Sequence, residues 1–237
     1  MVLSPSALLA LWEAGRPRHR IDRALLLFAF AEPERNPDEL ADLPIGTRNL
    51  ALLRLRAALF GLRLEAYADC PRCGERQTFD LDAQGLSGLP ECTAQAVSAD
   101  GYRFRVPTSR DIASLQGMSD AEEAAALLLR RCLLSMPDGT DDADGDLPAD
   151  LLAILEPLLE AADPAASYAL SFDCSCCGES IEQVFDVADY LWEELETYAL
   201  QLAGQVHRLA TAYHWSEREI LALSASRRAL YLGMLEQ

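Results

Sequence analysis

Asp69-Cys70-Pro71-Arg72-Cys73-Gly74-Glu75 and Asp173-Cys174-Ser175-Cys176-Cys177-Gly178-Glu179 are nearly the same heptapeptide, and each is followed closely by Phe-Asp. Each stretch holds a Cys-x-x-Cys pair followed by glycine, a residue that lets the backbone turn back toward the sulfur atoms. A tetrahedral Zn²⁺ ion takes four soft donors, and two such turns supply four thiolates. The repeat therefore predicts one zinc site built from two distant halves.

The expected ligands are Cys70, Cys73, Cys174 and Cys177, holding one structural Zn²⁺ per chain. Residues 74–173 lie between the two halves, so a shared metal requires both ends of that segment to meet in space. Cys176 stands between the second pair and could compete with either neighbour for the metal, which leaves the fourth ligand open at this stage.

The expected fold class is α+β and mainly helical, with a split four-cysteine zinc ribbon of two β-hairpins that holds an inserted unit of a hairpin and helices. Strand periodicity flanks both cysteine turns, and helical periodicity dominates elsewhere. The corresponding division is an N-terminal helical part at 1–61, the ribbon at 62–83 and 167–186, the insertion at 84–166, and a C-terminal helical part at 187–237.

Three helices are expected in the N-terminal part, together forming one small helical layer. Start and stop signals place them at Pro5–Trp12 with Ser4 as the cap, at Ile21–Ala31, and at Arg48–Phe60 with Thr47 as the cap and Gly61 as the end. In the insertion, an Asp100-Gly101 turn predicts a hairpin. Capping boxes at Thr108-x-x-Asp111 and Ser119-x-x-Glu122 predict two helices, and residues 151–159 predict a third that contains Pro157.

The C-terminal part begins with a long amphipathic helix, Val187–Tyr213. His207 and His214 would share one of its faces if the helix continued that far. A box at Ser216-x-x-Glu219 starts a short helix, and Ser224 or Ser226 starts the last one. Two short helices after a turn can form a DNA-binding helix-turn-helix, but a helical hairpin packed on the long helix is favoured because the last helix offers only Arg227 and Arg228 as cations.

Composition indicates a globular protein whose partners are proteins. Half of the 237 residues are hydrophobic, and the formal net charge is −18. This charge opposes nucleic-acid binding, which depends on Lys and Arg contacts to phosphate. No secretory signal and no membrane-spanning segment are expected, so the predicted location is a cytoplasm. In that reducing compartment seven cysteines favour metal ligands and buried thiols, with Cys132 as a buried apolar side chain.

The sequence offers little that suggests catalysis. None of its three histidines has a Cys or Ser partner at a recognisable spacing, so no catalytic residue is expected. The acidic stretch 138–146 lacks the glycine and glutamate positions of an EF-hand and is interpreted as a solvated loop. Two alternatives remain, a zinc-ribbon nucleic-acid or transcription-associated module and a Cys-x-x-Cys thiol oxidoreductase.

The chain resembles the baseplate (hub assembly) proteins of T-even-type contractile-tailed phages, whose relatives occur in contractile injection systems. The resemblance extends over almost the whole chain. It is carried by residues 43–48, 68–75, 104–111, 128–132, 185–194, 206–221 and 227–228. The Cys-Ser-Cys-Cys turn departs from the more usual Cys-Pro-x-Cys form.

The resemblance implies a structural or chaperone-like role in building the baseplate of a phage tail or injection device, with no enzymatic activity. The implied partners are other baseplate or hub and spike proteins, with neither nucleic acid nor membrane among them. The implied site is the host cytoplasm, with incorporation into the particle as a further option.

Overall fold

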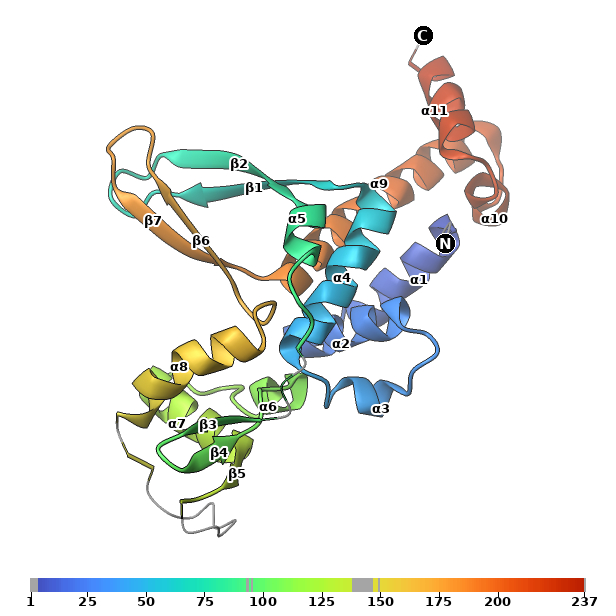
Figure 1. The fold of residues 1–237 in the computed structure, drawn as a ribbon. Helices are drawn as coiled ribbons and strands as arrows, with labels where there is room; N and C mark the ends of the chain where they lie inside the picture. Colours follow the sequence, from blue (N-terminus) through green and yellow to red (C-terminus); the bar gives the residue numbers. More distant parts are fainter. Residues whose placement is uncertain (1–3, 93, 95, 138–146, 149, 237) are drawn as a thin grey trace. The chain divides into compact units, whose positions relative to one another are not determined.

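The protein is described here by a computed structural model that covers residues 1–237 and gives a described placement for all except 1–3, 93, 95, 138–146, 149 and 237. The fold is α+β, with helices and small antiparallel sheets (Figure 1). The acidic stretch 138–146 lies outside the described residues. No helix within the described part of the chain is long and apolar enough to cross a membrane.

The chain divides into two compact units. The first joins the two ends of the sequence, Met1–Arg23 and Asp189–Gln237, and the second is Ala24–Ala188. The first helix, α1 (Pro5–Gly15), belongs to the unit that contains the C-terminal helices. Residues distant in the sequence therefore supply neighbours of α1, and the layer expected from the first three helices stays a prediction.

The first unit is helical in its described residues. It contains α1, capped by the Ser4 side chain, most of the long helix α9 (Val187–Tyr213), and two short helices, α10 (Glu217–Leu221) and α11 (Ala225–Met234). Leu9 of α1 packs against Ala199 and Leu202 of α9 in a buried cluster. Glu219 and Ser216 form the predicted capping box, and Ser224 caps α11, as one of the two proposed starts.

The end of α9 corrects the histidine prediction. The helix stops at Tyr213, and His214 has a φ of 55°, in the left-handed region that ends helices. His207 and His214 therefore do not share a helix face. Beyond this point, Tyr231 of α11 makes edge-on ring contacts with Tyr213 and Trp215, so the two short helices fold back as a helical hairpin.

Helix α2 (Arg20–Ala31) enters the second unit at Ala24, and the chain continues through the short α3 (Pro37–Leu40) to α4 (Ile45–Phe60). Gly61 ends α4 with a φ of 91°, as predicted. The predicted start at Arg48 with a Thr47 cap is wrong. The helix begins at Ile45 after Pro44, and neither residue supplies a side-chain cap.

Two antiparallel hairpins carry the cysteine turns. Strands β1 (Arg63–Asp69) and β2 (Arg76–Asp82) pair in register from Arg63↔Asp82 to Asp69↔Arg76. Strands β6 (Tyr168–Asp173) and β7 (Ser180–Phe185) pair from Tyr168↔Phe185 to Asp173↔Ser180. In Figure 1 the turns of the two hairpins meet at one end. The short helix α5 (Ala83–Ser87) follows β2 directly.

The segment between the hairpins has its own core. It contains β3 (Val97–Ala99), β4 (Tyr102–Phe104) and β5 (Leu133–Ser135) in one sheet, with α6 (Ser109–Ala113), α7 (Ala121–Cys132) and α8 (Leu151–Ala162). The buried side chains Phe104, Cys132, Leu151 and Leu155 form its centre. Sequence reasoning found the Asp100-Gly101 turn, where both residues have positive φ, but missed β5.

Of the two capping boxes predicted for this segment, one forms and the other does not. The Asp111 side chain accepts a hydrogen bond from the Thr108 backbone N–H at 2.9 Å, as predicted for α6. The box at Ser119 is wrong, because Asp120 caps α7 with its own carboxylate.

Polar contacts attach two places in this segment, the start of α6 and the residues after α8, to the start of α4. Asp163, after α8, accepts a hydrogen bond from the Gly46 backbone N–H at 2.9 Å, which satisfies one of the free amides of the α4 N-terminus. A Cβ atom at position 46 would collide with the same carboxylate. Asn49 donates to the backbone oxygens of Ala165 and Ala166 at 2.9 and 3.1 Å.

At the start of α6, Ser109 accepts a hydrogen bond from Arg48 of α4 at 3.0 Å. The second Asp163 oxygen has no partner among the described residues, and burial raises the pKa of this carboxyl. The Ile45 N–H also donates to the Pro107 carbonyl at 3.2 Å. We call these contacts between the start of α4 and residues 107, 109 and 163–166 the α4 junction.

Candidate metal centre

The two cysteine turns have the same backbone geometry. The Cys70 N–H donates to Glu75 O at 2.9 Å and the Gly74 N–H to Cys70 O at 2.9 Å. The corresponding distances in the second turn, from Cys174 to Glu179 and from Gly178 to Cys174, are 2.8 and 2.9 Å. Both glycines have positive φ, 72° and 69°, which side chains disfavour. The repeated sequence therefore produces a repeated structure.

The structure brings together the four cysteines that the sequence singled out. Sγ atoms of Cys70, Cys73, Cys174 and Cys177 all lie within 4.8 Å of one another. Two distances across the halves, Cys70 to Cys177 and Cys73 to Cys174, are 3.6 and 3.7 Å. Zinc–sulfur bonds of 2.3 Å in a tetrahedron place sulfur atoms ~3.8 Å apart. The donor set is therefore compatible with a four-coordinate metal ion.

The surroundings of the four thiols are asymmetric. Cys70 and Cys174 are buried, Cys177 is half-buried, and Cys73 is exposed. The two buried residues, Cys70 and Cys174, belong to a small apolar cluster with Ala68 and Ile181. Phe79 and Phe172 pack against this cluster. These two rings, one from each hairpin, have centroids 4.8 Å apart. The apolar side fixes the ligand positions, and the exposed side leaves Cys73 within reach of solvent.

The pKa values of Cys70 and Cys73 move in opposite directions. The Cys73 backbone N–H lowers the pKa of Cys70 to about 7. At Cys73 the Glu75 N–H acts in the same direction, but desolvation of the sulfur within the cluster and the three neighbouring thiols outweigh it and raise the pKa to about 12. Formation of one thiolate therefore disfavours loss of the proton from a neighbouring thiol. A bound cation would offset this repulsion, because metal binding to thiols is coupled to loss of their protons.

The remaining cysteines lie outside this cluster. Cys176 is exposed, so the geometry singles out Cys174 and Cys177 of the second turn. Cys132 is buried in the core of the inserted segment, where burial raises its pKa to about 11, in agreement with the predicted apolar role. Burial likewise raises the pKa of Cys92, a half-buried thiol.

Two polar contacts across the halves were not predicted. Arg72 forms an ion pair with Glu179 at 3.3 Å, joining the first turn to the second. Gln77 of β2 accepts a hydrogen bond from the Ser175 backbone N–H at 3.0 Å, and its amide nitrogen lies 3.5 Å from Cys174 Sγ. These residues are separated by about a hundred positions in sequence, so spacing gave no signal for either contact.

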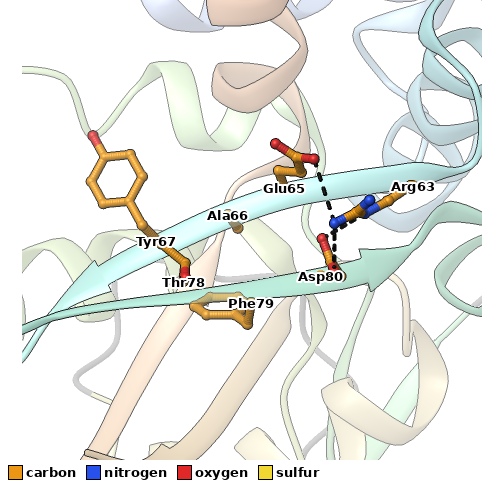
Figure 2. A pocket seen from close by; sticks show the side chains of 7 residues that line it. All are labelled: Arg63, Glu65, Ala66, Tyr67, Thr78, Phe79 and Asp80. Carbon is orange, nitrogen blue, oxygen red and sulfur yellow. Dashed lines mark hydrogen bonds and ion pairs between the residues drawn. The ribbon is translucent and has the colours of Figure 1, made fainter.

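A shallow hollow lies on the same hairpin, on the face of β1 and β2 shown in Figure 2. Arg63 at one end binds both oxygens of Asp80 at 2.8 and 3.0 Å and approaches Glu65 at 3.5 Å. Tyr67 at the other end is exposed, and the Arg76 guanidinium lies 4.2 Å from its ring centroid. The charges of the hollow are thus paired within the hairpin.

The C-terminal hairpin provides little basic surface. Arg228, one of the two arginines considered for a DNA-reading helix, is 3% exposed and donates to Gln205 of α9 and to the Leu223 carbonyl. Its guanidinium holds α11 on α9, which leaves Arg227 as the exposed member of the pair. Arg228 therefore packs α11 against α9 and adds no exposed positive charge to the last helix.

Comparison with known proteins adds no relative: no family model, no curated protein and no solved structure matches this chain.

Proposed function

We propose that the chain is a structural or chaperone-like assembly protein, braced by one Zn²⁺ bound to Cys70, Cys73, Cys174 and Cys177. The observation that carries the proposal is the gathering of four sulfur atoms from two turns separated by residues 74–173. Four cysteine ligands leave no open coordination position for a substrate, which is typical of structural zinc sites. When bound, the ion would hold the two hairpins together.

We further propose that the assembly served is the baseplate of a contractile phage tail or a related injection device, in the cytoplasm of the bacterial host. The sequence resemblance supports this part of the proposal. The acidic composition is consistent with protein partners that include basic surfaces, such as other baseplate or hub and spike subunits. The proposed role includes no enzymatic activity.

The test combines metal analysis with assembly. We expect about one zinc per purified chain, and co-purification of baseplate proteins from cells that express the neighbouring tail genes. The double variant Cys70→Ser/Cys73→Ser should lose the zinc and abolish tail assembly, whereas the matched variant Cys92→Ser should retain both. Normal particles from a metal-free, fully folded double variant would contradict the proposal.

The thiol oxidoreductase alternative has one supporting observation, the lowered pKa of Cys70. A reactive cysteine must also be accessible, and Cys70 is only 3% exposed. Alkylation distinguishes the two functions, because a metal-braced site protects all four thiols until the metal is removed. Rapid modification of one of the four in the metal-loaded protein would favour redox chemistry.

A further inference from the structure

Gln77 connects the two halves of the metal centre through one side chain. Its Oε1 accepts the Ser175 N–H at 3.0 Å, and its Nε2 lies 3.5 Å from Cys174 Sγ and 3.5 Å from the Glu75 carbonyl oxygen. These neighbours fix the orientation of the carboxamide, since its oxygen faces a donor and its nitrogen faces two acceptors.

The internal repeat shows why only one half has this contact. Aligning the two heptapeptides places Ser175 opposite Pro71, and Gln77 opposite Ile181. Proline has no backbone N–H, so the first turn leaves no donor at this position to be satisfied. On β7 of the second hairpin, the position that corresponds to Gln77 is Ile181, which is buried in the apolar cluster. Ser175 does have an N–H, and the strand of the other half carries the glutamine that accepts it.

We propose that Gln77 is an outer-sphere residue of the metal centre, one that docks the second turn onto β2 and donates a hydrogen bond to the Cys174 thiolate. The inference rests on the proposed metal site. Four thiolates around a divalent cation carry a net charge of −2, in a chain that is itself strongly acidic. An N–H donor to sulfur reduces that excess charge, and outer-sphere partners of this kind typically change metal affinity about 10- to 100-fold.

Two single variants separate the two contacts that Gln77 makes with the second turn. Gln77→Leu removes both contacts, whereas Gln77→Glu keeps an acceptor for the Ser175 N–H but has no N–H for sulfur. Gln183→Leu, at an exposed position of β7, is the matched control. The readouts on the full-length chain are zinc affinity, by competition with a chelator, and the thiolate-to-metal charge-transfer spectrum of the Co²⁺ form.

We expect Gln77→Leu and Gln77→Glu to lower zinc affinity about 10- to 100-fold and to shift the cobalt spectrum, with Gln183→Leu like the wild type. The double variant Gln77→Ile/Ser175→Pro copies the residue pair of the first half. It should bind zinc more tightly than Gln77→Leu, because no backbone N–H is left without an acceptor, while retaining the spectral shift.

Wild-type affinity and an unchanged cobalt spectrum in Gln77→Leu would overturn the inference. The same result in Gln77→Glu would remove the role of the N–H donor to sulfur, and this variant still reports if the leucine variant fails to fold. A wild-type chain that binds no zinc would instead overturn the proposed metal centre. The two failures are therefore distinguishable.

Discussion

At the scale of single residues, Asp111 shows how a buried charge is stabilised without a metal. The residue has no exposed surface, and its carboxylate accepts hydrogen bonds from the Thr108 N–H, from Arg105 at 2.9 Å and from Arg131 at 3.1 Å. Burial by itself raises the pKa of this group. Bonds from Arg105 and Thr108 outweigh burial and hold the pKa well below its usual range.

We therefore expect Asp111→Asn to destabilise the fold by about 3 kcal/mol at pH 7, because two arginines lose their buried partner. Since the folded-state pKa is depressed, the stabilisation is present above the unfolded pKa of about 3.9 and is lost as the pH falls below it. The difference between wild type and variant should thus shrink from pH 5 toward pH 2, measured by urea unfolding.

Asp42→Asn is the control for this experiment, because Asp42 forms an exposed ion pair with Arg110. Such pairs contribute about 0.2–1 kcal/mol, so the control should differ little from wild type at any pH. An Asp111→Asn effect as small as that of Asp42→Asn would mean that the buried carboxylate is not a stabilising centre.

At the scale of secondary-structure elements, α7 tests the corrected helix start. The Asp120 carboxylate accepts from the Glu122 N–H at 2.8 Å and from the Glu123 N–H at 3.2 Å. Asp120→Ala should therefore cost about 1 kcal/mol, and the adjacent Ser119→Ala should cost almost nothing. Thermal or chemical unfolding of the two variants checks the assignment, and the reverse order of stability would restore the capping box first predicted at Ser119.

Caps made by neighbouring residues could be predicted from sequence, whereas caps made by distant residues could not. Ser4 and Ser216 lie beside the amides they satisfy, so local pattern was sufficient. The start of α4 has no such neighbour, and Asp163 reaches it from far along the chain. Prediction accordingly placed the helix too late. Strand β5 was missed for a similar reason, because three residues directly after α7 gain strand geometry only by pairing with β4.

The same distinction applies to the metal centre. The four cysteines could be predicted because a Cys-x-x-Cys-Gly turn is a local signal and occurs twice. Gln77 and the Arg72–Glu179 pair could not, since their contacts depend on how the two hairpins meet. The internal repeat does contain one signal for Gln77, because Ser175 stands in the second turn where the first turn has Pro71. This signal can be interpreted only when the two turns are known to face each other.

At the scale of the whole molecule, two separate attachments hold the second unit together: the four-cysteine cluster and the α4 junction. The first joins the turns of the hairpins, and the second joins α4 to the start of α6 and to the residues after α8. A two-stranded hairpin alone is marginally stable in water. Beyond the cysteines, the hairpins contact each other through Phe79 and Phe172 and through the two polar bridges.

Removal of the proposed Zn²⁺ should therefore loosen one attachment and leave the other. We expect chelation to accelerate amide hydrogen exchange in β1, β2, β6 and β7 by about tenfold or more, corresponding to a local loss of about 1.4 kcal/mol or more. Amide hydrogen exchange in α4 and in the helices of the first unit should change little, because the contacts described for these helices include no cysteine ligand. Added Zn²⁺ should restore protection, and Cys70→Ser/Cys73→Ser should reproduce the chelated pattern without a chelator. Equal acceleration throughout both units would show instead that the chain unfolds as one cooperative body when the cysteine cluster opens, and that the α4 junction cannot hold the inserted segment by itself.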